Sequence, residues 1–479
     1  MEANYSPKYF LYVLFILGSS FVTCLLHFRQ PFFFNHLSSG GTVVSLPFSR
    51  NVSFFFSTPS AVVADDWQST TSSSSSSCDG RYVHMVDLPP QLHVCAEGSP
   101  AFTSEHSICQ LMSNAGLGPL YECLTDDPTA ADAVYVPYYA AMEMQPHTCG
   151  PFNSTVRDGA TQQLLMWLSS RPAWSAFGGR DHFMVASRTS WMFRRVAGDD
   201  DTGCGNSFML RPETRNMTVV TYETAIWEQP RRDFAVPYPS YFHPASAGEV
   251  ATWQARMRAT SRPWLFAFAG ARRPNGTLPI RDHIFDACDA AIPRRSCGKL
   301  DCDGGHGAND CRSPRKLMAL FSSSRFCLQP LGDSFMRRSS VDAIMAGCIP
   351  VFFHEASTFE KQYQWHERDP QQSEHSEQSN NGRRYYVFID QEDVLQGKVD
   401  IEEALSRYSD GEAAAMREEV INMIPRFLYK DPRVRFAGDM RDAFDITIDE
   451  VIARIRMIKE EEDLGKKEKS DGVVIANGS

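Results

Sequence analysis

Residues 326–353 constrain the fold of this chain more than any other segment. They read FCLQPLGDSFMRRSSVDAIMAGCIPVFF, in which an apolar run breaks at residues 330–332 and a second apolar run follows. Between the runs, apolar residues recur at helical spacing. Asp333 and Ser334 are good N-cap residues, and Gly347 is placed to end the helix. The segment therefore predicts a strand, a glycine turn, a helix that begins near Asp333, and a second strand.

Arg337 and Arg338 lie close to the start of this predicted helix. Cations there oppose the helix dipole, at a cost of a few tenths to about 1 kcal/mol each. An anion bound at the helix N-terminus would offset that cost, because free N–H groups already point at it. One interpretation is a cradle for a diphosphate. The other is that Arg338 pairs with Asp342, four residues on, while Arg337 is solvated.

A second turn has the same composition. The predicted strand PWLFAFAG ends at Gly270, and Arg272 and Arg273 follow. Ligands of doubly wound sheets bind beyond the carboxyl ends of the strands. Two basic turns on one such edge would bind a nucleotide diphosphate, because arginine contacts phosphate in bidentate fashion. Asp342 would then either accept from ribose hydroxyls or pair with Arg338.

Length and charge set the outer limits. The chain has 479 residues, enough for two packed domains with appendages, and its formal net charge of −11 without a basic stripe argues against a nucleic-acid binder. Residues 9–28 carry no charge over about 20 positions, which favours a transmembrane anchor over a cleaved signal. Residues 1–8 would form a cytosolic tail. Residues 29–79 are a Ser-rich stem, a flexible tether.

Sequons and cysteines indicate the compartment. Glycosylation sequons begin at Asn51, Asn153, Asn216 and Asn275, and the chain has 13 cysteines. Together with one N-terminal anchor, they fit a lumenal catalytic body in an oxidising compartment. Buried free thiols are the alternative for the cysteines. Their pairing cannot be read from the sequence.

Strands that alternate with helices predict an α/β class with parallel sheets. The first domain covers residues 80–250 and the second residues 251–459, joined by a helix at 250–261. A polar surface loop is expected at residues 373–384, an amphipathic helix at 443–459 and a disordered tail at 460–479. Further strands are predicted at residues 82–87, 133–139, 178–187, 216–222 and 385–389, and residues 235–244 form a proline-punctuated loop.

Three residues of the first domain are candidates for a general base. Asp181 and His182 stand at the entrance of a predicted strand, and Glu143 follows the end of another. Histidine is the usual base near neutral pH, and a desolvated carboxylate can also serve. The alternative for the first two is an Asp-capped turn with a structural histidine. His243 could line the same cleft or bond to a backbone carbonyl.

Two clusters resemble metal sites only in composition. The acidic run at residues 199–201 lies in a polar stretch without an apolar strand before it, which favours a solvated loop. Cys297, Cys302, Cys311 and His306 have irregular spacing for zinc ligands. Disulfides are the better interpretation in a lumenal protein.

Four separated motifs, in a fixed order, carry a resemblance to a known family. GRDHFMVASR, AVPYPSYFHP, LFAFAGARRP and the 326–353 segment resemble the plant exostosin-type glycosyltransferases, in particular the xyloglucan galactosyltransferase group. The likeness covers roughly residues 80–460. It implies a type II Golgi membrane protein with a lumenal body and a GT-B fold, in which two Rossmann-like domains face a cleft. The first domain would bind the acceptor and the second the nucleotide sugar.

The resemblance also implies an activity: inverting transfer from a UDP-sugar, usually UDP-galactose, to xylosyl side chains of xyloglucan in the cell wall. No metal is obligatory, because arginines and a helix N-terminus can stabilise the leaving UDP. Complexes with other Golgi glycosyltransferases are a further expectation. The donor motifs fall on Gly270, Arg272, Arg273, Gln329, Gly332, Asp333, Ser334, Arg337 and Arg338.

Two departures and three alternatives remain. The 373–384 loop is longer than the family pattern, and residues 271–273 need not match a relative's turn, so donor or acceptor choice could differ. The donor could be another UDP-sugar, such as UDP-galacturonic acid, or the acceptor another wall glycan. The fold could instead serve as an inactive glycan-binding or assembly partner. A hydrolase with paired carboxylates is disfavoured, because the basic turns would have no purpose.

Overall fold

A computed structural model of the protein describes residues 78, 80–92, 122–196, 203–228, 231–273, 277–303, 310–311, 313–367 and 385–476. These residues belong to one compact unit, residues 74–479. Within them, no helix has the length and apolar character needed to cross a bilayer. The predicted anchor at 9–28, nearly all of the stem and the polar loop at 373–384 lie outside the described residues.

The first sheet has five parallel strands in the order β1-β2-β3-β4-β5. Four of them confirm predicted strands, with shorter bounds. The fifth was not predicted and ends where the expected proline-punctuated loop at 235–244 begins. The strands are β1 (Val83–Met85), β2 (Ala133–Tyr135), β3 (His182–Val185), β4 (Thr218–Thr221) and β5 (Asp233–Ala235), and the helices between β2 and β3 are α3 (Ala140–Met144), α4 (Ser154–Ser169) and α5 (Pro172–Phe177).

The second sheet also has five parallel strands, in the order β10-β9-β8-β6-β7. The chain leaves β6 toward β7 on one side and returns to β8 on the other, so the strand order reverses between β6 and β8. This reversal is the switch point at which open α/β sheets bind ligands. The strands are β6 (Trp264–Gly270), β7 (Cys297–Asp301), β8 (Ser324–Gln329), β9 (Ile349–Phe352) and β10 (Val387–Phe388). Two parallel-stranded domains confirm the expected pair of Rossmann-like, GT-B-like units.

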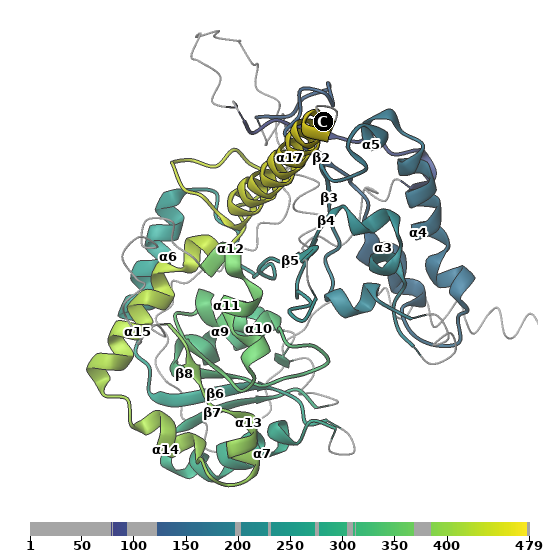
Figure 1. Ribbon diagram of the computed structural model, residues 1–479. Helices are drawn as coiled ribbons and strands as arrows, with labels where there is room; N and C mark the ends of the chain where they lie inside the picture. The colour runs from purple at the N-terminus through teal and green to yellow at the C-terminus, as the bar shows by residue number, and fades with distance from the viewer. Residues whose placement is uncertain are drawn as a thin grey trace, which may run out of the picture. The chain divides into compact units, whose positions relative to one another are not determined.

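Helices surround the second sheet (Figure 1). The helix α6 (Ala247–Ala259) joins the domains and belongs to the second, since Trp253 Nε1 donates to the carbonyl of Met345 at 2.8 Å. The others are α7 (Pro279–Ala291), α9 (Pro314–Ser322), α10 (Arg338–Met345), α11 (Phe359–Gln362), α12 (Gln364–Glu367), α13 (Gln391–Leu395), α14 (Ile401–Ser406), α15 (Asp410–Asn422) and α16 (Ile424–Phe427).

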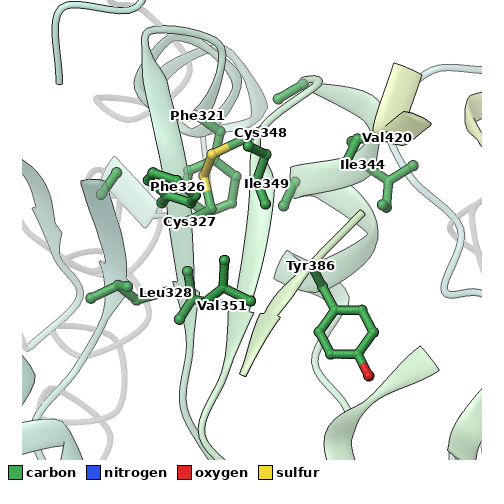
Figure 2. Close-up of a cluster of buried hydrophobic side chains, with 14 of the residues drawn as sticks. Phe321, Phe326, Cys327, Leu328, Ile344, Cys348, Ile349, Val351, Tyr386 and Val420 are labelled. Carbon is green, nitrogen blue, oxygen red and sulfur yellow. A yellow bond between two sulfur atoms is a disulfide. The ribbon is translucent and has the colours of Figure 1, made fainter. Parts of the chain in front are cut away.

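The core of the second domain explains why its strands read as continuous apolar runs. Figure 2 shows Phe326 and Leu328 of β8 beside Ile349 and Val351 of β9, all at most 2% exposed. A strand that is buried on both faces has no polar side to alternate with. The disulfide Cys327–Cys348 lies in this core and links the end of the turn after α10 to β8.

The helix α10 begins later than the sequence predicts. It starts at Arg338 with Arg337 as the N-cap, so Asp333 and Ser334 are not its caps. Residues 333–336 instead reach the first domain, where the N–H of Met336 donates to Glu223 Oε2 at 2.9 Å. A contact distant in sequence thus decides where the helix begins. The predicted helix end is confirmed, since Gly347 has a φ of +59°.

The C-terminal helix α17 (Ala443–Ala476) corrects both the predicted domain division and the predicted tail. Its buried residues Phe444, Ile448 and Val451 pack in the core of the first sheet, although residues 251–459 were assigned to the second domain. In Figure 1 the helix lies beside the first sheet. It continues through residues 460–476, where disorder was predicted, because this segment is rich in Glu, Lys and other good helix formers.

Five disulfides occur among the described residues and confirm the disulfide interpretation of the cysteines. Cys297 and Cys302, which have a zinc-like composition with Cys311, bond to different partners. Within the described part of the chain, no cluster of three or more metal-ligating side chains occurs. His306 and residues 199–201 lie outside it. The pairs are Cys78–Cys123, Cys149–Cys204, Cys288–Cys297, Cys302–Cys311 and Cys327–Cys348.

Candidate active site

Three arginines gather at the carboxyl ends of β6 and β8. Arg337 and Arg273 both pair with Asp333, Arg337 at 3.9 Å between Nη2 and Oδ1. Arg281, at the start of α7, donates from Nε to the carbonyl of Leu331 at 3.0 Å and from Nη1 to that of Ala271 at 2.8 Å. Burial and the nearby cations Arg337 and Arg273 lower the pKa of Arg281 to about 10. Arg337 and Arg273 therefore share one carboxylate, with Arg281 close by.

The absence of a side chain at Gly332 leaves room for the guanidinium of Arg337. A Cβ at Gly332 would stand 0.6 Å from Arg337 Nη2, so the guanidinium lies directly against the backbone of the turn. Burial lowers the pKa of Arg337, which indicates that the charge is poorly hydrated where it lies. Gly332 and Arg337 were both predicted as members of the donor turn, and they lie in contact. Sequence analysis missed Arg281, which follows the turn by eight residues without a strand-end signal.

Several buried polar atoms at this edge have no hydrogen-bond partner among the described residues. Unsatisfied buried groups cost about 1–3 kcal/mol each, so a cluster of them marks a site that a ligand would complete. Gln329 Oε1 accepts from Ser339 Oγ at 2.6 Å, which leaves its amide nitrogen as a donor. The unpartnered atoms are Nε and Nη2 of Arg337, Nε and Nη2 of Arg338, Nε2 of Gln329 and Oδ1 of Asp342.

Arg338 and Asp342 form the pair that the sequence left open. Arg338 Nε lies 3.7 Å from Asp342 Oδ2, and the guanidinium covers the ring of Tyr241 at 3.6 Å from its centroid. Asp342 is 1% exposed. Burial raises the pKa of Asp342 to about 7, against the opposing effect of Arg338. The pair is therefore present, and Asp342 keeps Oδ1 for a second partner.

Arg272 does not belong with the other arginines, contrary to its predicted role as a phosphate ligand. It contacts Asp282 at 3.3 Å and Asp286 at 2.7 Å, both on α7, and covers the ring of Phe285 at 4.8 Å. Its charge is therefore neutralised by the acids of α7. Gly270 is needed for a different reason, because a Cβ there would lie 2.4 Å from the ring of Phe268.

Glu223 brings the first domain to this edge, and sequence analysis missed it. It follows β4 at its carboxyl end, is 1% exposed, and holds the N–H of Met336. Burial raises the pKa of Glu223, while its hydrogen bonds from residues 334–336 and the charge of Arg337 act in the opposite direction. An acidic residue directly after an apolar strand was the available signal. The two domains thus meet where β4 and β8 end.

Glu143, another of the predicted bases, lies beyond the carboxyl end of a strand of the first sheet. It lies in α3, just after β2, and its Oε1 is 3.6 Å from His147 Nε2. Glu143 Oε2 is buried without a hydrogen-bond partner among the described residues. Burial raises the pKa of Glu143, with a hydrogen bond from Tyr138 opposing it, and burial and Arg157 lower the pKa of His147.

Asp181 and His182 lie at the opposite edge, so the structural alternative is correct for them. They stand at the amino end of β3, about 10 Å from its carboxyl end at the usual rise of a strand. His182 is 1% exposed, its Nδ1 is 2.7 Å from Asp181 Oδ1, and its ring packs edge-on against Trp174. His243 likewise bonds to a backbone carbonyl, that of Tyr429, at 3.0 Å.

The sequons differ in how the fold presents them. Asn153 is exposed and caps α4 by accepting from the N–H of Val156, which leaves its amide nitrogen outward. Asn216 instead donates its amide to the carbonyl of Gly178 at 2.9 Å, and Thr218 of the same sequon is fully buried. The folded protein therefore does not present Asn216. Asn51 and Asn275 lie outside the described residues.

Comparisons with known proteins identify the family of the chain. A family model described as the exostosin GT47 domain matches residues 77–405. The xyloglucan galactosyltransferase MUR3 of Arabidopsis thaliana is 37% identical over 415 residues, which cover 80% of this chain but 63% of that protein. The xyloglucan-specific galacturonosyltransferase 1 of the same plant is 32% identical over 408 residues, 79% of this chain and 58% of that protein.

A solved glycosyltransferase from Rickettsia africae overlaps 78% of this chain and 98% of its own, with a TM-score of 0.35 and 8% identity. A structural similarity with so low a TM-score carries no argument about function. The fold is defined here by the topology of the two sheets. The family match covers well over half of the chain. The chain belongs to the exostosin GT47 family of glycosyltransferases.

Proposed function

We propose that the protein transfers galactose from UDP-galactose to xylosyl side chains of xyloglucan, with inversion at the anomeric carbon. The observation that carries this proposal is the set of buried, unpartnered donors of Gln329, Arg337 and Arg338 at the switch point between β6 and β8. A diphosphate accepts from such donors, and the name of the relative MUR3 supports this choice of donor sugar and acceptor.

The arginines would stabilise the leaving group. As the acceptor oxygen bonds to the anomeric carbon, the bond from that carbon to the diphosphate breaks and UDP leaves with the electron pair. Arg337, with Arg273 and Arg281 beside it, would hold the charge that develops on the phosphate oxygens. These residues supply positive charge without an obligatory metal. Asp342 Oδ1 is the acceptor available to the ribose hydroxyls.

Glu143 is the proposed general base. Its pKa is raised by burial, which brings it closer to the range where a carboxylate can take a proton near neutral pH. It would accept the proton of the attacking xylosyl hydroxyl. His147, 3.6 Å away, would share the charge change.

The compartment is part of the same proposal. We place the protein in the Golgi membrane as a type II protein, with residues 9–28 as its anchor and the catalytic body in the lumen. The five disulfides of the described residues support an oxidising compartment, because cytosolic thiols are kept reduced. Other Golgi glycosyltransferases remain the expected partners.

UDP-galacturonic acid is the second candidate donor. Its carboxylate would need one more cation than galactose does, and the surplus of Arg273, Arg281 and Arg337 over Asp333 could supply it. The name of a relative that is 32% identical favours it as well.

A donor screen tests the proposal. The full chain, in detergent, is incubated with a series of UDP-sugars and xyloglucan oligosaccharides, and the product linkage is determined by NMR. Galactose on xylose is the expected result; transfer of galacturonic acid alone would support the second candidate. UDP at a hundredfold its dissociation constant should raise the stability by about 2.7 kcal/mol. No transfer and no UDP-dependent shift would leave an inactive assembly partner.

The base is tested separately. Glu143→Gln should lower kcat by about 10²–10⁴-fold, because no carboxylate then takes the proton of the attacking sugar hydroxyl. The UDP-dependent thermal shift should not change. Asp181→Asn is the matched control on the opposite edge of the sheet and should keep most of the activity. A larger loss of kcat in Asp181→Asn than in Glu143→Gln would indicate Asp181 as the base.

A further inference from the structure

The loop that follows β4 presents an exposed tryptophan. Trp227 is 61% exposed, which makes it the most exposed tryptophan of the described residues. Its indole contacts the ring of Phe335 edge-on, with the centroids 5.9 Å apart. Phe335 belongs to the turn after β8, the same turn that carries Arg337. An aromatic side chain of each domain therefore lies at the mouth of the candidate active site.

This loop is held firmly in place. The N–H of Thr224 donates to Gln362 Oε1 at 2.9 Å, and that of Ala225 donates to Asp233 Oδ2 at 2.7 Å. Glu228, directly after the tryptophan, pairs with Arg194 and Arg232. The exposure of Trp227 is therefore a fixed feature of the fold, since buried hydrogen bonds and ion pairs anchor the loop on both sides of it.

The surroundings of Trp227 indicate what kind of molecule would cover it. Its sequence neighbour Glu228 is charged and hydrogen-bonded, and Ala225 is fully buried. A protein partner needs a contiguous apolar patch of a few hundred Å². The small aromatic surface of Trp227 and Phe335, with the charged Glu228 beside it, suits a pyranose ring, whose C–H face is apolar and whose rim of hydroxyls is polar.

We propose that Trp227, with Phe335 against its edge, is the platform on which one sugar ring of the acceptor glycan stacks. This proposal rests on the proposed function, because it assumes that a polysaccharide approaches the cleft. Glu223, four residues earlier, holds the N–H of Met336 next to Phe335. A ring stacked on Trp227 would therefore lie next to Phe335, two positions before Arg337 in the donor turn, and on the side of the first domain.

The test compares Trp227→Ala and Trp227→Phe with the unaltered full chain. Binding of a xylosylated cello-oligosaccharide is measured by calorimetry, and UDP binding by thermal shift. The alanine variant should bind the oligosaccharide about tenfold more weakly, as expected for the loss of one aromatic contact, and the phenylalanine variant should recover part of that loss. UDP affinity should not change. Met166→Ala, on α4, removes an equally exposed apolar side chain (59%) and should change neither affinity.

Three results would overturn the platform. The first is unchanged oligosaccharide affinity in Trp227→Ala. The second is an equal loss of UDP affinity, which would mean that the indole only supports the donor turn through Phe335. The third is an unaltered protein that binds no such oligosaccharide. Failure of the proposed function gives a different result, because absence of transfer from every UDP-sugar leaves the binding comparison intact.

Discussion

The two basic turns of the second domain have similar sequences but differ in how their arginines are neutralised. After β6, Arg272 meets the acids Asp282 and Asp286 of α7 and is neutralised. After β8, the first turn of α10 contains no acid, and the acids near Arg337 are the exposed Asp333 and the buried Glu223 of the first domain. Glycine and arginine at a strand end therefore do not identify an anion site by themselves. The composition of the next helix decides.

The helix dipole gives the physical reason. An acid in the first turn of α7, Asp282, already complements the partial positive charge of that helix end. The N-terminus of α10 instead has Arg337 as its cap and Arg338 as its first residue, so charges of one sign meet there. Asp333 and Asp342 offset part of this charge, and an anion bound at the helix N-terminus would balance the rest. Four experiments would break or sharpen this contrast.

The largest effect is expected from Arg337→Ala. Removal of the unneutralised guanidinium should lower kcat by about 10²–10³-fold, because charge on the leaving diphosphate loses its main stabiliser. Steady-state kinetics at saturating acceptor would measure this. Full turnover and unchanged donor affinity in this variant would show that Arg337 does not bind the donor diphosphate.

Asp342→Asn tests the acid that α10 does contain. Because burial raises the pKa of Asp342 to about 7, the native state keeps a proton that the unfolded chain releases above about pH 4. The unfolded state then binds fewer protons, so this group lowers stability as pH rises from about 4 to 7. Melting temperatures across that range should fall less steeply for the asparagine variant. Asp442, whose pKa is also about 7, contributes equally to both proteins. Parallel curves would refute the raised pKa.

The glycines of the two turns form a matched pair. Gly332→Ala would meet the mobile end of Arg337 and push the guanidinium aside, so donor KM should rise about tenfold with little change in melting temperature. Gly270→Ala would meet the ring of Phe268, which is 1% exposed and cannot yield, and should destabilise the fold by about 1–3 kcal/mol. Donor titrations and thermal melts of both variants would separate the two effects. A raised donor KM in Gly270→Ala, together with a lower melting temperature in Gly332→Ala, would contradict the prediction.

The smallest effect is expected from Arg272→Ala. Its partners are exposed surface acids, and such pairs contribute about 0–1 kcal/mol. Activity should stay within a few-fold of the unaltered protein, and the melting temperature should fall slightly. A loss of turnover as large as that of Arg337→Ala would mean that Arg272 leaves its acids when the donor binds.

Local patterns predicted much of the fold. The strands β8 and β9 are almost entirely buried, so their apolar runs are unambiguous, and Gly347 marks a helix end through its own backbone. The strand β7 was not predicted, because its sequence CGKLD has no apolar run. What could not be predicted depends on distant contacts. The start of α10 is decided by Glu223, more than 100 residues earlier, and α17 packs against strands at the other end of the chain.

The candidate site divides in the same way. Gln329, Gly332 and Arg337 were identified because a strand, a turn and a helix end lie within one short segment. Asp181 and His182 were candidates because of their residue types, although the sequence already places them at the entrance of a strand, opposite the edge where ligands bind. Arg281 and Glu223 were missed because their neighbours at the site come from other turns and another domain.

The disulfide Cys327–Cys348 has a topological consequence. The two cysteines are 21 residues apart, and Gln329, Gly332, Arg337, Arg338 and Asp342 all lie between them. The proposed donor contacts other than Arg273 and Arg281 thus belong to one covalently closed ring, which removes roughly 3 kcal/mol of conformational freedom from the unfolded chain. Reduction would loosen the UDP site while leaving Trp227, outside the ring, on its anchored loop. Oxidative folding would therefore govern recognition of the donor separately from recognition of the glycan.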